Sequence, residues 1–148
     1  MQVIAETDDD RIVMVEQFRF GSDDFSLEFP GGMMDGGETP EEAAARELEE
    51  ETGFCGERPQ LIARMYPNPA IQTNRVNVVL MENCRKEKPT KFDEFENLKA
   101  STVTPSDLIA SVEAGKISHC IVIAAIAKYM LLRGIPTDVS KRRTFREN

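Results

Sequence analysis

Residues 32–54 read GMMDGGETPEEAAARELEEETGF, a glycine-rich turn followed by a strongly acidic stretch. Thr39 can cap a helix, Pro40 suits its first position, and Glu42 completes a Thr-x-x-Glu capping box. Gly53 stands just past the acidic stretch, where a left-handed residue is needed to end a helix. The stretch therefore predicts a helix whose two ends are specified by its own sequence.

The predicted helix, residues 40–52, gathers three carboxylates on one face. At 100° per residue, Glu47, Glu50 and Glu51 fall within about a third of the circumference. Neighbouring carboxylates repel one another by roughly a few tenths of a kcal/mol per exposed pair, and by more when desolvated. Arg46 offsets only part of this charge. Hard oxygen ligands of this kind suit Mg²⁺ or Mn²⁺, so the pattern predicts a metal site, with a glutamate-rich surface helix as the alternative.

The remaining positions predict how this helix packs. Ala45, Leu48 and Thr52 occupy the arc beside the carboxylates and are expected to pack on a sheet. Ala43 and Ala44 lie on the acidic side one turn earlier, where we expect their small side chains to leave room for a ligand.

The spacing of the stretch resembles a known family signature at every fixed position. Its pattern is G-x5-E-x7-R-E-U-x-E-E-x-G-U, where U is a bulky apolar residue, and this is the box of the Nudix hydrolases. The similarity covers roughly residues 3–134 and implies the family's fold, an α/β/α sandwich with a mixed β-sheet packed between helices. We expect one Nudix hydrolase domain over residues 1–136 and a loosely ordered tail over residues 137–148.

The resemblance implies a set of metal ligands made of carboxylates and one backbone carbonyl: Glu47, Glu50, Glu51, and Gly31 or Gly32. In the family, the counterparts of Glu47 and Glu51 bind metal directly, and that of Glu50 does so directly or through water. Glu38 and Arg46 are expected to orient the loop and the helix. Arg46 and Glu50 are also predicted to take part in catalysis.

Nudix enzymes hydrolyse the pyrophosphate of a nucleoside diphosphate linked to another group, and the predicted site suits this reaction. Metal ions neutralise phosphate charge and activate water, so no Ser-His-Asp device is needed. The only histidine, His119, is expected to be structural, at the start of a C-terminal helix. In the family's ADP-ribose pyrophosphatases a loop glutamate is the general base. Matching the strand that follows the loop places the corresponding residue at Glu94, with Glu96 as the second candidate. The alternative is an acidic loop with no role in the reaction.

Two further segments resemble ADP-ribose and nucleoside-diphosphate-sugar pyrophosphatases. Residues 15–19, VEQFR, match the segment whose arginine holds phosphate, so Arg19 is either a bidentate phosphate ligand or a charge at a strand end. Residues 26–32, SLEFPGG, place Glu28 near the site. Pro69 stands where ADP-ribose-type members carry a proline, and we include it among the substrate-binding residues, although the residues after it depart from the usual Ser-Pro-Gly marker.

Recognition of a nucleobase is expected to use few side chains. The chain has no Trp and only two Tyr. Stacking therefore falls to one of four aromatic residues, namely Phe18, Phe20, Phe29 or Tyr66. Relatives of this type usually carry additional N-terminal strands that build a dimer and contribute to the base pocket. We expect a homodimer that is built differently, or else weak recognition of the base.

Composition excludes several other classes of function. A net charge of −8 leaves no basic stripe for nucleic acid. The sequence has no membrane span and no signal pattern, and three scattered cysteines indicate free thiols in a reducing cytoplasm. The favoured function is metal-dependent hydrolysis, with Mg²⁺ or Mn²⁺, of ADP-ribose or a related nucleoside diphosphate sugar. The alternatives are a housecleaning pyrophosphatase of (d)NTPs and a non-catalytic module that binds nucleotide sugars.

Hydrophobic periodicity and turn residues predict the other elements. The expected strands cover residues 2–5, 11–17, 26–29, 61–66, 75–81 and 98–103, the first two forming a hairpin. The expected helices after residue 52 cover residues 106–114 and 117–132.

Overall fold

The structure is a computed structural model that describes residues 1–90 and 98–135. Within this part of the chain, strands and helices mix without a strict βαβ alternation. The strands are β1 (Gln2–Thr7), β2 (Ile12–Arg19), β3 (Asp24–Glu28), β4 (Phe54–Met65), β5 (Val76–Lys86) and β6 (Lys99–Val103). The helices are α1 (Pro40–Thr52), α2 (Pro105–Glu113) and α3 (Cys120–Arg133).

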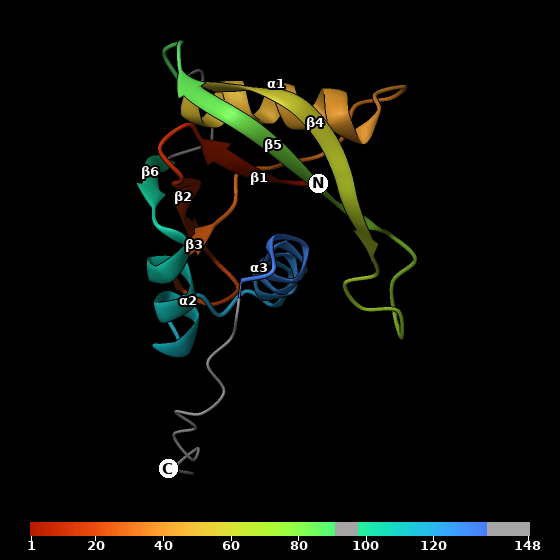
Figure 1. The fold of residues 1–148 in the computed structure, drawn as a ribbon. Coiled ribbons are helices and arrows are strands. Elements are labelled where there is room, and N and C mark those ends of the chain that lie inside the picture. Colours follow the sequence, from red (N-terminus) through yellow and green to blue (C-terminus); the bar gives the residue numbers. More distant parts are fainter. Residues whose placement is uncertain (91–97, 136–148) are drawn as a thin grey trace.

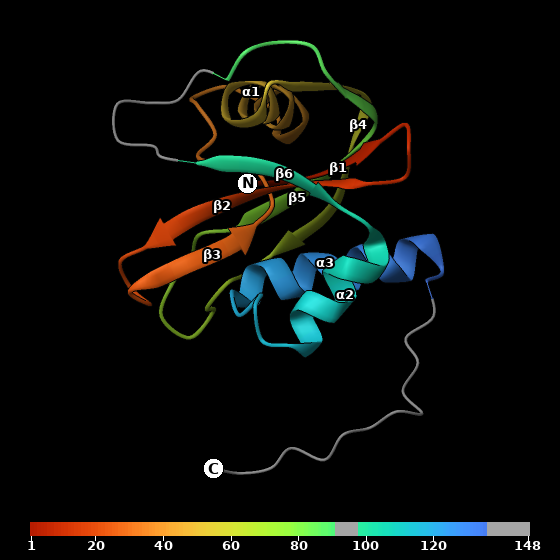
Figure 2. The same cartoon turned by 90° about the vertical axis from the view of Figure 1, so that its left-hand side faces the viewer.

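The strands form one mixed sheet that lies between two layers of helix (Figure 1). Its order is β3-β2-β1-β5-β4. The sixth strand, β6, lies off this path and pairs with β2. β1 and β5 run parallel, and the other pairs are antiparallel. α1 covers one face of the sheet, and α2 and α3 cover the other (Figure 2). The predicted α/β/α sandwich is confirmed.

Alternation along the central strands divides the core in two, because successive side chains of a strand point to opposite faces. Val3 and Ala5 of β1 pack with Leu48 on the α1 side. Ile4 packs with Ile126 on the α3 side. Each large side chain that is fully buried in this way stabilises the fold by roughly 1.5–3 kcal/mol.

Helix α1 begins and ends where the sequence predicts. The Thr39 hydroxyl accepts the Glu42 N–H at 3.2 Å, and the Glu42 carboxylate accepts the Thr39 N–H at 2.8 Å. Gly53 follows with φ of +72°, and a Cβ there would lie 2.1 Å from the carbonyl oxygen of Lys88. Only glycine therefore fits this position, both for its backbone angle and for the close approach of the segment after β5.

The predicted packing of α1 is confirmed for Leu48 and Thr52 and wrong for the three alanines. Ala43 and Ala44 are fully buried against the sheet and leave no room for a ligand, whereas Ala45 is exposed. The buried arc takes in Glu47 and Glu51 as well as Leu48 and Thr52. The carboxylates can occupy this arc because donors face them there.

Other boundaries differ from the sequence prediction where turn-forming residues obscure the pattern. β4 begins at Phe54, because its register shifts accommodate residues 56–60, which include a glycine and a proline, on an edge strand. α3 begins at Cys120, with His119 as its cap rather than inside it. β1 forms the predicted hairpin with β2 through a single residue pair and pairs mainly with β5. The predicted tail, residues 137–148, lies outside the described residues.

None of the helices in residues 1–90 and 98–135 has the length and apolar character needed to cross a membrane.

Candidate functional site

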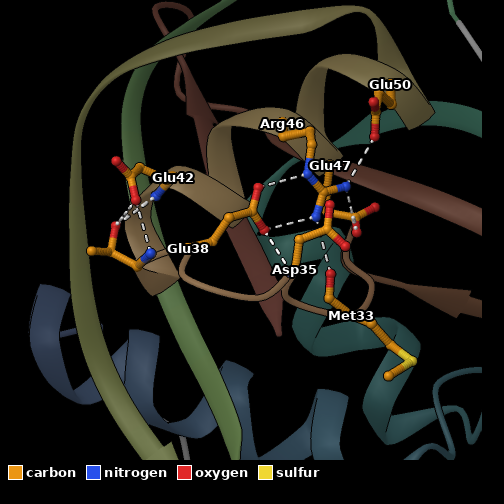
Figure 3. Close-up of polar contacts among 8 residues, drawn as sticks. Met33, Asp35, Glu38, Glu42, Arg46, Glu47 and Glu50 are labelled. Atoms are coloured by element: carbon orange, nitrogen blue, oxygen red, sulfur yellow. Dashed lines mark hydrogen bonds and ion pairs between the residues drawn. The ribbon is translucent and has the colours of Figure 1, made fainter.

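Arg46 lies at the centre of the polar network on α1 (Figure 3). Its Nε and Nη2 bind the two carboxylate oxygens of Glu38 at 2.9 and 3.0 Å. Nη1 donates to Glu47 and Glu50, both at 3.1 Å, and Nη2 also donates to the carbonyl oxygen of Met33 at 3.0 Å. A guanidinium carries five N–H donors. The network engages all five, so Arg46 ties the glycine-rich turn to the helix and has no donor left for a ligand.

The charges in this network shift one another's pKa values. The Arg46 guanidinium, helped by the Asp35 N–H, lowers the pKa of Glu38 to about 2. Glu38 in turn raises the pKa of Arg46 far above its ordinary value, with smaller contributions from Glu50 and Glu47, while burial opposes them. Glu38 and Arg46 therefore stay ionised at every pH at which the protein is expected to work.

Glu47 and Glu51 form the inner part of the acidic face, and only 9% and 4% of each residue is exposed. Glu51 accepts the Gly31 N–H at 2.9 Å. A Cβ at Gly32 would lie 2.3 Å from Oε1 of Glu47, so the turn must lack a side chain for this carboxylate to approach it. Gly32 thus lets the Glu47 carboxylate approach the backbone of the turn. Glu50 is more open, with 40% of its side chain exposed.

The donor set at this point is chemically suited to a divalent cation. The Met1 amino group donates to the Gly32 carbonyl at 2.5 Å, next to the carboxylates. Burial lowers the pKa of this amino group, and the charges of Glu47 and Glu51 oppose the shift. The carboxylate and carbonyl oxygens here are the hard ligands that Mg²⁺ prefers. Within residues 1–90 and 98–135, however, no three His, Cys, Asp or Glu side chains converge on one metal position.

Arg19 and Glu28 form an ion pair beside the acidic face. Arg19 Nε and Nη2 donate to the two Glu28 oxygens at 2.8 and 2.7 Å, and the Glu28 side chain is 3% exposed against 45% for Arg19. Burial acts to raise the pKa of Glu28, but hydrogen bonds from Arg19 and Ser26 outweigh it and lower that pKa. The charge of Glu51 adds to the rise in the pKa of Arg19, so the pair lies within electrostatic reach of α1.

The other predicted site residues lie elsewhere. Pro69 is in the β4–β5 loop, which extends to the lower right of Figure 1, away from α1. Glu94 and Glu96 lie outside the described residues. The His119 Nδ1 accepts the Ile121 N–H at 3.2 Å as the cap of α3, a structural role.

Two contacts of this site were missed by reasoning from the sequence. They are the Met33 carbonyl, which holds Arg46, and the Ser26 hydroxyl, which supports Glu28. Backbone carbonyls carry no sequence signal. Ser26 and Glu28 are two residues apart on β3, so the alternation of a strand already places them on the same face.

Comparison with known proteins adds to this geometry. The family model described as NUDIX domain matches residues 2–120. An ADP-ribose pyrophosphatase of Bacillus subtilis (strain 168) is 36% identical over 116 residues, covering 78% of this chain and 63% of that protein. An ADP-sugar pyrophosphatase of Mus musculus is 33% identical over 126 residues, covering 81% and 58%. The chain thus spans roughly three fifths of the length of these relatives.

A crystal structure of an ADP compounds hydrolase has the same fold. It aligns with a TM-score of 0.80 over 90% of this chain and 71% of that chain, at 23% sequence identity.

Proposed function

The chain belongs to the NUDIX domain family, and on that premise we propose that it hydrolyses the pyrophosphate bond of ADP-ribose or a related nucleoside diphosphate sugar. The products are a nucleoside monophosphate and a sugar phosphate. One observation carries the proposal: the carboxylates of Glu47 and Glu51 are buried against a glycine turn, with Arg19 within reach. The names of the two relatives, an ADP-ribose pyrophosphatase and an ADP-sugar pyrophosphatase, point to the same class of substrate.

We assign the cation-holding role to Glu47, Glu50 and Glu51, together with a carbonyl of the Gly31–Gly32 turn. A divalent cation bound there, Mg²⁺ or Mn²⁺, would offset charge on the phosphate oxygens and lower the pKa of the attacking water. The chain's own contribution is a fixed cluster of oxygens, held by the Gly31 N–H and by Arg46 before a ligand arrives. Such preorganisation avoids the cost of ordering these groups during the reaction.

Arg19 is assigned to a phosphate of the substrate, and Glu28 to positioning Arg19. Nε and Nη2 of Arg19 are held by the buried Glu28, and among the described residues no acceptor binds its Nη1. The half-exposed guanidinium can therefore present these remaining donors to a phosphate in a fixed orientation. Arg46 is assigned to positioning the acidic face, because its donors are all engaged within the chain.

The general base is assigned to Glu94, with Glu96 second, on the resemblance of the loop alone. Substrate contact by Pro69 stays a prediction. It requires the β4–β5 loop, which extends away from α1, to approach a ligand bound there. The assignment of Glu94 is tested by a single substitution. Glu94→Gln should lower kcat while cation binding is unchanged, and unaltered kcat would remove Glu94 from the reaction.

A hydrolysis screen tests the proposed reaction. The purified chain is incubated with ADP-ribose, other nucleotide sugars, dinucleoside polyphosphates and (d)NTPs, with Mg²⁺ or Mn²⁺, and the products are separated by chromatography. We expect AMP and ribose 5-phosphate from ADP-ribose. Cleavage confined to triphosphates would instead establish the housecleaning alternative. Binding of nucleotide sugars without any product would establish the non-catalytic module, which the retained glutamates of α1 argue against.

We further propose that the chain acts as a homodimer in the cytoplasm. The dimer rests on the family resemblance, and the location rests on the free cysteines. Light scattering after size-exclusion chromatography tests the first, with a mass near 16.6 kDa as the result that contradicts it. Cell fractionation tests the second.

A further inference from the structure

The hairpin of β2 and β3 carries an exposed aromatic cluster. Phe20 is 92% exposed and Phe25 is 61% exposed. Both rings meet Phe18 edge to face, with centroids 5.3 and 5.5 Å apart. Phenylalanine is normally among the most buried residues, and an aromatic group left in water next to a site is typical of a binding surface.

A hollow of about 410 Å³ lies beside this cluster. Four consecutive residues of β3, 24–27, line one wall, and Lys116 and Ser118 from the turn between α2 and α3 line the other. Because successive residues of a strand point to opposite faces, a hollow lined by four in a row runs along the strand's edge. β3 is the end strand of the sheet order, so its outer N–H and C=O groups face this space. The volume is in the range of small-molecule sites.

The hollow adjoins the proposed phosphate ligand. Ser26 lines it and also hydrogen-bonds to Glu28, which holds Arg19. Asp24 lines it as well and is the register partner of Arg19 across the hairpin. Phe18 pairs with Phe25 and Arg19 pairs with Asp24, so the aromatic cluster and Arg19 lie on opposite faces of the hairpin. A molecule that crosses the open edge of β3 can therefore reach the Arg19 guanidinium on one face and the aromatic cluster on the other.

The other candidate aromatic residues are poorly placed for a substrate. Phe29 is 2% exposed and has no face open to a ligand. Tyr66 is half-exposed, but Arg75 lies over one face of its ring, with the guanidinium carbon 5.0 Å from the ring centre, and both residues lie by the loop remote from α1. Tyr129 is buried, with its hydroxyl bound to Glu6. Among the described residues, only the hairpin offers open aromatic faces next to the phosphate ligand.

We infer that the hollow along β3 is the subsite for the nucleoside half of the substrate, with the base on Phe20 and Phe25. The inference rests on the proposed function for the identity of the ligand. Asp24 and Ser26 provide acceptors and a hydroxyl for the ribose, and the phosphate extends to Arg19. This arrangement gives the chain a base site made from its own hairpin.

Binding of AMP and of ribose 5-phosphate, measured by calorimetry on the full chain with Mg²⁺, tests the subsite without depending on turnover. Phe20→Ala and Phe25→Ala, singly and together, remove exposed rings and should leave the fold intact. We expect the double variant to weaken AMP binding by about tenfold, the lower range for base stacking, and to leave ribose 5-phosphate unchanged. Tyr66→Ala is the matched control and should leave both ligands unchanged.

Three results would overturn the subsite: no AMP binding by the wild-type chain, equal weakening of both ligands in the double variant, or loss of AMP binding in Tyr66→Ala alone. Phe25→Tyr keeps the ring face and should therefore retain AMP affinity. This retention is not required if Phe25→Ala acts only through the structure of the hairpin. The proposed reaction fails separately, through an absence of products in the hydrolysis screen. Base-dependent AMP binding combined with no products would retain the subsite and discard the reaction.

Discussion

Helices α1 and α3 cover opposite faces of one sheet and are almost equal in length, at 13 and 14 residues. Each ends at a glycine in the left-handed conformation. The buried face of α3 is largely apolar, with five residues, Val122, Ala125, Ile126, Tyr129 and Met130. The buried face of α1 holds Glu47 and Glu51 beside two alanines and a leucine.

This difference separates a helix held by apolar burial from one that carries a polar site. Burying a carboxylate costs free energy unless donors or cations face it. α1 bears that cost because the Gly31 N–H binds Glu51 and Arg46 binds Glu47. A helix needed only to cover a sheet would bury apolar residues, as α3 does, so the glutamates of α1 indicate a function. Substitutions on the two helices should accordingly change different properties.

The largest expected effect is on the reaction, from α1. Glu51→Gln keeps the shape of the side chain but removes its charge, so kcat for ADP-ribose should fall on the order of 10²–10³-fold. The Gly31 N–H can still bind the amide oxygen, and the fold should persist by circular dichroism. Glu49→Gln is the matched control on the same helix, since its partly exposed pair with Lys88 contributes little. Wild-type kcat in Glu51→Gln would contradict the assigned role.

The corresponding change on α3 should affect stability alone. Ile126→Ala opens a cavity in the core between α3 and the sheet and should lower the free energy of unfolding by about 3 kcal/mol in urea titrations. The kcat of the folded fraction should be unchanged. Leu131→Ala, at a residue that is 82% exposed on the same helix, should change the free energy of unfolding by less than about 0.5 kcal/mol. A large drop in kcat for Ile126→Ala would remove the contrast between the two helices.

A smaller effect separates positioning by Arg46 from substrate contact by Arg19. Arg46→Lys keeps the charge but loses the planar fork that joins Glu38, Glu47 and the Met33 carbonyl. We expect kcat to fall about tenfold, the lower range for a residue that orients metal ligands, with KM unchanged. Arg19→Lys should mainly raise KM. A rise in KM for Arg46→Lys with unchanged kcat would show that Arg46 contacts the substrate.

The smallest effect should appear only in acid. The pKa of Glu38 falls from 4.5 to about 2 because the Arg46 guanidinium binds it in the folded chain. A lowered folded-state pKa stabilises the protein above the unfolded-state pKa, and this contribution disappears as the pH falls from about 4.5 to about 2. The Tm of the wild-type chain should therefore drop more steeply over this window than that of Glu38→Gln. Parallel slopes would show that the pair adds no pH-dependent stability.

The failures of sequence reasoning share a physical origin. The limits of α1 are predicted correctly because a capping box and a terminal glycine are local signals. The rotation of α1 about its own axis is not predicted correctly. Periodicity places apolar residues toward the sheet, and it cannot show that donors near the glycine turn face Glu47 and Glu51. The first half of β4 is not predicted for a similar reason. Register shifts on an edge strand accommodate residues whose types are typical of loops.

The sequence by itself determines the acidic helix, its caps, the mixed α/β architecture and the family, because these depend on residue spacing along the chain. Only the tertiary structure decides which donors meet the carboxylates, that Glu28 holds Arg19, and that an open strand edge joins this arginine to exposed phenylalanines. Those relations join residues on different elements, on paired strands or on opposite faces of the hairpin. Their energies depend on distances that exist only after the sheet has paired and the helices have packed on it.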